Sequence, residues 1–508
     1  MIRSLLLQLT LRDRYVFLFA FAYILFVGGI AQLWLIPHYF ADPSARIGLL
    51  PNTDASLYHH AAMGLLDALE TLGWRAWKLY PEGHSLSGIA AAMYYLFVPL
   101  PLVMLPFSAL AHACVALGLI SMGHSLGFSR QAMRVGALVY ILLPSSLLWL
   151  VQLNKDIYFI LGLVLVMRAW MWLVPPVSRQ QSPRQRAELC ATYMLGLLLI
   201  WLTRPYAVGI TQIALVAAFI FFLGLRLCFI GKRGLLYSAS VGLAAIVAIS
   251  VLTQLLTYLP ERLKGERAVM LTSWNAIAER HEVPAKAVHD DASIVTESKV
   301  TQRKVTVRKV TESKLTARKV TESTVTESNV TESTVTEGEV TKGKIVRYLE
   351  LLVAQRLSYV TNDGKAASRI DVDAIHTIED IPLYAPRAMI VGYTFPTFWQ
   401  FLDVKSGASK AAMFIAGLEM LLVNIGLVAL LLRQRYLALP NRLALAMLVA
   451  CSVLLVVVNV YAIPNLGTLY RVRYGPLMLL AVLGWAAIVE MRQARKEPVN
   501  HATQAVSL

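Results

Sequence analysis

The sequence predicts an all-α integral membrane protein, a polytopic helical bundle of about ten to twelve transmembrane helices with two long loops on the outer face. Three observations lead to this fold class. Hydrophobic residues make up 57% of the 508 residues and charged residues only 15%, which is far from the balance of a soluble globular protein. The apolar residues gather in long runs, and the loops between these runs alternate between strongly and weakly basic.

The apolar runs have the length of membrane-spanning helices, because crossing a bilayer takes about 20 residues in helical conformation. Lipid offers the backbone no hydrogen bonds, and the runs are too long and too uniformly apolar for barrel strands. The first run is longer than a signal-peptide core and lacks a convincing cleavage site, so we expect it to be retained. The runs cover about 15–37, 102–123, 132–150, 157–174, 188–204, 207–230, 234–258, 409–432, 443–463 and 475–491.

The orientation follows from lysine and arginine, which favour the cytoplasmic loops. Every second loop and both ends of the chain are basic, so we expect cytoplasmic termini in the plasma (inner) membrane. The net charge of +16 is then explained mainly by topology and a basic repeat, and it does not call for nucleic acid as a partner. The basic residues concerned are Arg3, Arg12, Arg14, Arg130, Arg134, Arg179, Arg184, Arg186, Lys232, Arg233, Arg433, Arg435, Arg442, Arg492, Arg495 and Lys496.

The predicted topology divides the chain into three parts. Residues 1–258 form an N-terminal membrane bundle, whose first outer loop, 38–87, is long enough to carry a site. Within and after that loop, apolar residues at helical spacing predict a helix over 57–72, and the short apolar stretch 88–100 predicts an interfacial or re-entrant segment. An outer-face segment follows over 259–408. The last part, 409–508, contains the C-terminal membrane helices and a short cytoplasmic tail.

The second outer segment contains ten consecutive five-residue units over 295–344, of the type Val-Thr-Glu-Ser-Lys. A period of five matches neither the helical period of 3.6 nor the strand period of 2, so one apolar residue per unit cannot stay on one face. The low hydrophobicity predicts a disordered insertion without a catalytic role. A spacer or surface-binding role is the alternative.

Unusual polar residues flank several apolar runs, and the predicted topology places all of them on the outer side: Asp54, Lys155, Asp156, Arg204, Arg471 and Arg473. Such a set predicts an active site that opens to the periplasm or exterior. Each member also has an ordinary explanation. Asp54 could be a helix N-cap, Lys155 and Asp156 an interfacial ion pair, Arg204 a side chain that extends to the interface, and the last two arginines contacts to lipid headgroups.

Short motifs in a fixed order carry a family resemblance. The chain resembles the polytopic glycosyltransferases of the GT-C class, in particular the bacterial relatives that use polyprenyl-phosphate sugars. The resemblance covers nearly the whole chain except the repeat. It rests on Asn52-Thr53-Asp54 with Tyr58-His59, Pro144-Ser145-Ser146, Asn154-Lys155-Asp156, Arg204-Pro205-Tyr206, Tyr384-Ala385-Pro386-Arg387, and Pro464-Asn465 with Tyr470-Arg471-Val472-Arg473-Tyr474.

The resemblance implies sugar transfer from a polyprenyl-phosphate-linked donor to a glycan or lipid acceptor, in surface polysaccharide or glycoconjugate synthesis. Asp54 is the expected catalytic residue. The family often has a pair of acids in this loop, whereas here Asp42 and Glu82 lie at a distance. A divalent cation is therefore possible but not indicated, and no metal ligands or cofactors are assigned. Donor-phosphate binding is expected from Arg471, Arg473, Lys155 and Arg204, and acceptor or sugar binding from Tyr58, His59, Asp156 and Arg387.

The chemistry agrees with these assignments, because sugar transfer needs a base for the acceptor hydroxyl and cations for the departing phosphate. A polysaccharide polymerase or ligase that uses lipid-linked glycans is the nearest alternative, and it is favoured if the arginines matter more than Asp54. A transporter is a third class. It would need polar residues near the middle of the membrane and related halves, of which the sequence shows little.

Overall fold

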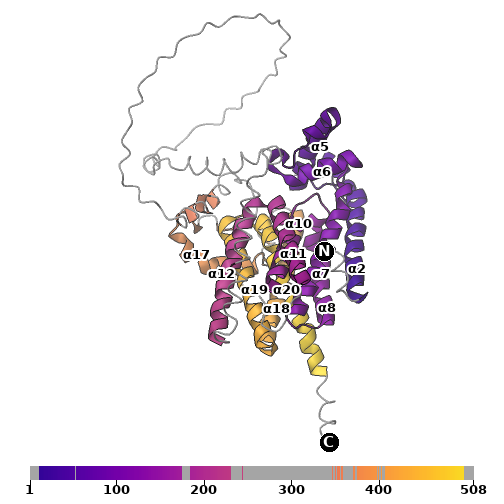
Figure 1. Cartoon of the computed structure of the whole chain (residues 1–508). Coiled ribbons are helices and arrows are strands. Elements are labelled where there is room, and N and C mark those ends of the chain that lie inside the picture. The colour runs from indigo at the N-terminus through magenta and orange to yellow at the C-terminus, as the bar shows by residue number, and fades with distance from the viewer. Residues whose placement is uncertain are drawn as a thin grey trace, which may run out of the picture.

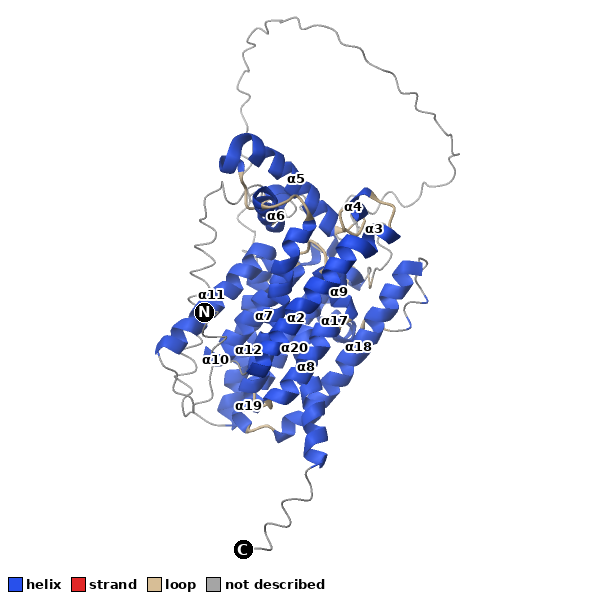
Figure 2. Cartoon of the chain, turned by 90° about the vertical axis from the view of Figure 1, so that its right-hand side faces the viewer, coloured by secondary structure: helices blue, strands red, loops and turns tan. Residues whose placement is uncertain are grey.

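The structure, a computed structural model of the chain, describes residues 11–51, 53–173, 183–229, 374–397 and 407–496, together with isolated positions between them. Every regular element within these ranges is helical (Figure 2). The pentapeptide repeat at 295–344 lies outside the described residues, as does the apolar run at 234–258 apart from Leu243. The all-α prediction is therefore confirmed for the part of the chain that the structure describes.

Six helices in the described ranges are long and apolar enough to cross a membrane. They make the chain a multi-pass membrane protein, as the composition predicts. These helices span Leu11–Tyr39, Pro101–Ser125, Ala207–Phe229, Lys410–Tyr436, Leu439–Ala462 and Leu466–Ala494.

The predicted number of ten to twelve spans is not supported, and the reason differs from run to run. The run at 132–150 is divided into α8 (Arg130–Leu142) and α9 (Pro144–Leu150), because Pro144 has no N–H group to continue a helix. The helices α10 (Asp156–Leu173) and α11 (Pro183–Thr203) belong to the bundle, but neither is among the six. The described residues therefore support six spans.

The bundle helices run side by side and pack closely in pairs (Figure 1). The main pairs are α10 with α11, α18 with α20, and α2 with α7. Glycines allow two of these close approaches. A Cβ atom at Gly484 of α20 would lie 2.0 Å from the carbonyl oxygen of Gly426 in α18, and one at Gly162 of α10 would lie 2.8 Å from that of Gly196 in α11. Besides α8 to α11, the bundle contains α2 (Leu11–Ile30), α7 (Leu105–Ser125), α12 (Pro205–Phe229), α18 (Gly407–Arg433), α19 (Leu439–Ala462) and α20 (Leu466–Lys496).

A small layer of helices lies beyond one end of the bundle (Figures 1 and 2). Its main members are α5 (Asp54–Leu72), at the place of the helix predicted over 57–72, and α6 (Ser85–Leu96), which is too short to span a membrane. These two helices share an apolar core of their own, to which Tyr58 and Tyr94 belong. The short helices α3 (Ile36–Tyr39) and α4 (Pro43–Arg46) precede them, and α17 (Asp380–Thr394) packs against α19.

Three arginines at the opposite end of the bundle are paired with acids. Asp13 is fully buried and accepts hydrogen bonds of 2.8 Å from both Arg130 and Arg134. Near the end of α20, Glu490 pairs with Arg433 at 2.9 Å. Two of the arginine groups that predict cytoplasmic loops therefore lie at the end farthest from α5 and α6 (Figure 1).

Candidate functional site

The first turn of α5 presents Asp54 toward the bundle. Thr53 occupies the N-cap position with an extended backbone, and its hydroxyl donates to the carbonyl of Leu50 at 2.8 Å. Asp54 is the first helical residue, and its carboxylate is 45% exposed. The N-cap role considered for Asp54 from the sequence thus falls to the position of Thr53, and the Asp54 carboxylate has another partner.

Two helix junctions bring Asp156 and Arg204 together. Asn154 accepts a hydrogen bond of 3.3 Å from the backbone N–H of Asp156, where α10 begins. Arg204 lies between α11 and α12, since Pro205 starts a new helix after it. The Arg204 guanidinium donates to Oδ1 of Asp156, and only 7% and 2% of the two side chains are exposed. The pair is therefore a buried ion pair that ties the start of α10 to the α11–α12 junction.

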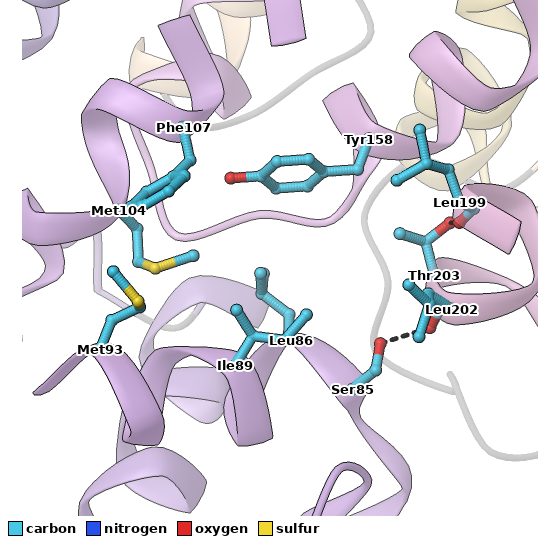
Figure 3. A pocket seen from close by; sticks show the side chains of 10 residues that line it. All are labelled: Ser85, Leu86, Ile89, Met93, Met104, Phe107, Tyr158, Leu199, Leu202 and Thr203. Atoms are coloured by element: carbon cyan, nitrogen blue, oxygen red, sulfur yellow. Dashed lines mark hydrogen bonds between the residues drawn. The ribbon is translucent and has the colours of Figure 1, made fainter. Parts of the chain in front are cut away.

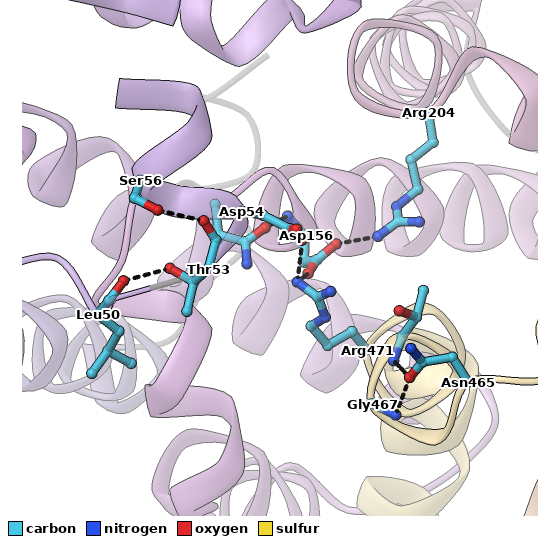
Figure 4. A network of polar contacts seen from close by, with 11 residues as sticks. Leu50, Thr53, Asp54, Ser56, Asp156, Arg204, Asn465, Gly467 and Arg471 are labelled. Carbon is cyan, nitrogen blue, oxygen red and sulfur yellow. Dashed lines mark hydrogen bonds and ion pairs between the residues drawn. The ribbon is translucent and has the colours of Figure 1, made fainter. Parts of the chain in front are cut away.

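Arg471 connects this buried pair to Asp54. It lies in the first turns of α20. Asn465 precedes this helix, and its side-chain oxygen accepts hydrogen bonds from the backbone N–H groups of Gly467 and Thr468. The Nη1 atom of Arg471 lies 2.7 Å from Oδ2 of Asp54 and 3.8 Å from Oδ2 of Asp156. Figure 4 shows the Arg471 guanidinium beside both carboxylates, with Arg204 on the far side of Asp156.

Lys155 lies beside these groups, against the ring of Tyr58, which in turn contacts the tilted ring of His84. Its Nζ atom is 5.4 Å from the ring centroid of Tyr58, whose ring is 4.9 Å from that of His84. Burial, together with the positive charge of Arg204, lowers the pKa of Lys155 to about 8. Burial and the nearby ammonium also lower the pKa of His84 to about 4, so this imidazole is neutral at pH 7.

We call the five charged residues Asp54, Lys155, Asp156, Arg204 and Arg471 the outer polar cluster. Its three cations and two carboxylates leave a net charge of +1 (3 − 2). They come from four separate parts of the chain and meet at the end of the bundle that carries α5 and α6. Guanidinium and ammonium groups are the usual protein ligands of phosphate, so the cluster is suited to an anion.

Three residues predicted for the site have other surroundings. Arg473 is fully buried and donates to the carbonyls of Val391 and Gly392, at 2.6 and 2.7 Å, so it holds the end of α17. The sequence placed it with Arg471 in a short loop, whereas both lie in α20. Arg387 forms a two-pronged ion pair with Asp371, at 2.9 and 3.1 Å.

His59, the third of these residues, is buried between α5 and α6. Its Nδ1 atom lies 3.1 Å from the hydroxyl of Tyr94. Burial lowers the pKa of His59 to about 4. Its neighbour in the chain, Tyr58, faces Lys155 instead, and burial raises the pKa of that phenol. The Tyr58-His59 pair is therefore split between the outer polar cluster and the α5–α6 contact.

An apolar cavity of about 120 Å³ is lined in part by residues that are close in the chain to members of the outer polar cluster (Figure 3). Two of its lining residues are near the cluster in the chain: Thr203 directly precedes Arg204, and Tyr158 lies two residues after Asp156. The remaining walls come from α6, the start of α7 and the end of α11. They are formed by Ser85, Leu86, Ile89, Met93, Met104, Phe107, Leu199 and Leu202.

No sequence pattern pointed to His84 or to this cavity. Both arise from contacts between segments far apart in the chain, and neither has a diagnostic spacing. Within the described ranges, no group of three or more His, Cys, Asp or Glu residues is placed to hold a metal ion.

Comparison of the chain with protein-family models, curated proteins and solved structures gives no match. The function therefore has to be inferred from the side chains of the site.

Proposed function

We propose that the protein is a membrane glycosyltransferase that moves a sugar from a polyprenyl-phosphate-linked donor to a glycan or lipid acceptor. The observation that carries this proposal is the contact between Asp54 and Arg471, 2.7 Å long, within a cluster of three cations. A half-exposed carboxylate supplies a base that an acceptor can reach, and the cations supply a phosphate site. The apolar cavity supports a donor with a hydrocarbon part.

The reaction needs one displacement at the sugar carbon. The acceptor oxygen forms a bond to that carbon while its proton passes to the Asp54 carboxylate. The bond between the carbon and the phosphate oxygen breaks, and the phosphate leaves with the electron pair. Arg471, Arg204 and Lys155 stabilise the negative charge that develops on the phosphate. No protein nucleophile takes part, so we expect inversion at the carbon.

We further propose that the site faces the periplasm or exterior, with both termini in the cytoplasm and outer loops at 38–87 and 259–408. This arrangement is supported by the separation of the outer polar cluster from the arginines at the other end of the bundle. The membrane is then the plasma (inner) membrane. A full set of ten to twelve crossings remains a proposal for the whole chain.

A polysaccharide polymerase or ligase is the second candidate. Three cations against a single exposed carboxylate also suit an enzyme that relies on holding a lipid-linked phosphate. The two candidates differ in how strongly turnover depends on Asp54.

The proposed function is tested by purified protein in nanodiscs, with polyprenyl-phosphate sugars and nucleotide sugars as alternative radiolabelled donors. We expect transfer from the lipid-linked donors only, release of the lipid phosphate, and inversion at the sugar carbon by NMR of the product. Absence of transfer from every lipid-linked donor, or retention of configuration, would overturn the proposal. An Asp54→Asn sample prepared in the same way controls for contaminating transferases.

A further inference from the structure

The two carboxylates that contact Arg471 are held very differently. Asp156 is 2% exposed, and its other oxygen is bound by the buried Arg204. Asp54 is 45% exposed, and Arg471 is the cation within 4 Å of its carboxylate among the described residues. An exposed ion pair contributes little, whereas removing one partner from a buried pair is costly. An anion that arrives at Arg471 therefore displaces Asp54 and leaves Asp156 in place.

Displacement of Asp54 changes the charge of the anion site. Lys155, Arg204 and Arg471 then face Asp156 alone, which gives a net charge of +2 (3 − 1). A phosphate diester carries one negative charge. A phosphate monoester carries close to two at pH 7, because its second pKa is about 6. The opened site therefore matches a monoester better than a diester.

We propose that the outer polar cluster is a binding site selective for phosphate monoester dianions, and that Asp54 competes with the bound phosphate for Arg471. The inference rests on the proposed function for its choice of phosphate as the ligand. It adds that the site fits the departing lipid phosphate better than the intact donor. Binding of the phosphate frees the Asp54 carboxylate for the acceptor. When that carboxylate returns to Arg471 after the reaction, it helps the lipid phosphate to leave.

The experiment measures binding without an acceptor, by calorimetry on the full chain in phosphatidylcholine nanodiscs at pH 7.5. The probes are dodecyl phosphate, methyl dodecyl phosphate and inorganic phosphate. We expect dodecyl phosphate to bind about fivefold or more tightly than the methyl diester, which is the effect of one added charge pair about 4 Å apart even in water-like surroundings. Equal binding of inorganic phosphate would identify free phosphate as the source of the same dianion.

The variant Asp54→Asn removes the competitor and should tighten dodecyl phosphate binding by about two- to fivefold, the range for an exposed ion pair. Arg471→Gln should weaken it. Glu490→Gln is the matched control, because it releases Arg433 from a similar pair at the other end of the bundle and should change nothing.

Equal affinity for monoester and diester, or weaker monoester binding by Asp54→Asn, would overturn the proposal. A gain with Glu490→Gln as large as with Asp54→Asn would do the same, since it would reveal unspecific attraction. Loss of the proposed function gives a different result. In that case no lipid-linked sugar is transferred, while the preference for the monoester and the gain with Asp54→Asn persist.

Discussion

Two carboxylates that contact one guanidinium have different tasks because their surroundings differ. Asp156 lies inside the bundle, where an uncompensated charge is expensive, and it holds Arg204. Asp54 lies at the water-facing side of Arg471 and can leave it at little cost. The sequence assigned Asp156 to the acceptor or sugar. Its position favours a different role, in which it holds the arginines that meet the phosphate.

Replacement of the buried acid tests this difference. Asp156→Asn leaves Arg204 buried without its carboxylate, so we expect the free energy of unfolding to fall by about 3–5 kcal/mol. The measurement is chemical unfolding in detergent, followed by tryptophan fluorescence. Glu188→Gln breaks an ion pair whose arginine is 85% exposed, and it should cost under about 1 kcal/mol. Similar losses for both variants would show that Asp156 is not a structural anchor.

The lowered pKa of Lys155 predicts a pH dependence of anion binding. The ammonium loses its proton as the pH rises through about 8, so phosphate affinity should fall between pH 7 and pH 9. Folding stability changes in the opposite direction. The folded state binds fewer protons than the unfolded state between pH 8 and the ordinary lysine pKa, so stability rises there. The charged and polar groups that face Lys155 are Asp54, Tyr58, His84, Asp156, Arg204 and Arg471.

The measurement for Lys155 is the affinity for dodecyl phosphate at pH 7, 8 and 9, in wild type and in Lys155→Met. Lys155→Met should bind dodecyl phosphate more weakly than wild type at pH 7, and its affinity should not fall between pH 7 and pH 9. A decline of equal size in both proteins would place the titrating group elsewhere. His84 does not titrate in this range, because its pKa is about 4.

Many residues of the site could be predicted from the sequence, but which of them contact one another could not. Polar residues at the ends of apolar runs pointed to Asp54, Arg204 and Arg471. Their contacts depend on how α5, the α11–α12 junction and α20 meet, which no local pattern encodes. Arg473 shows the limit. Residues two apart on a helix are separated by about 200° of rotation about its axis. Arg471 and Arg473 both belong to α20, so their side chains face opposite ways.

At the scale of elements, hydrophobic runs predicted the presence of helices well and their membrane crossing less well. Counting apolar residues ignored the proline that divides one run at Pro144, and α10 and α11 are not among the six long apolar helices although both belong to the bundle. Close packing depends on glycines whose partners lie on other helices. Gly162 and Gly196 allow α10 and α11 to touch, as Gly426 and Gly484 do for α18 and α20.

A single methyl group tests this packing. Gly484→Ala would place a Cβ atom 2.0 Å from a backbone oxygen of α18, so the helices must separate. We expect a loss of about 1–3 kcal/mol, the usual result of overpacking. Gly209→Ala is the control, because nothing lies within 4 Å of its Cβ position. It should be neutral or stabilising by up to about 1 kcal/mol. Thermal unfolding in detergent measures both, and equal losses would refute the packing argument.

At the scale of the whole molecule, the bundle has two unlike ends. One end carries α5, α6 and the outer polar cluster, and the other carries the arginine pairs with Asp13 and Glu490. The alternation of basic loops in the sequence predicts such a separation. The sequence could not predict that Arg130, Arg134 and Arg433 at the second end have acidic partners, because Asp13 and Glu490 lie far from them in the chain.

The orientation of the two ends is open to direct measurement. We predict that a cysteine at Leu57, which is 49% exposed on α5, reacts with an impermeant maleimide added to intact cells. A cysteine at Gln434, at the other end of the bundle, should react only after permeabilisation. Both are introduced after replacement of the four native cysteines. The reverse pattern would invert the proposed topology and place the site in the cytoplasm.

In the proposed reaction two residues that touch divide the work of sugar transfer: Asp54 serves the acceptor and Arg471 the phosphate. Steady-state kinetics of transfer from a radiolabelled lipid-linked sugar, by wild type, Asp54→Asn and Arg471→Gln in nanodiscs, tests it most directly. Loss of the base should lower kcat by about 10²–10⁴-fold without raising the KM for the donor. Arg471→Gln should raise that KM and lower kcat together. Near-normal turnover by Asp54→Asn beside an inactive Arg471→Gln would contradict the claim and favour the polymerase or ligase.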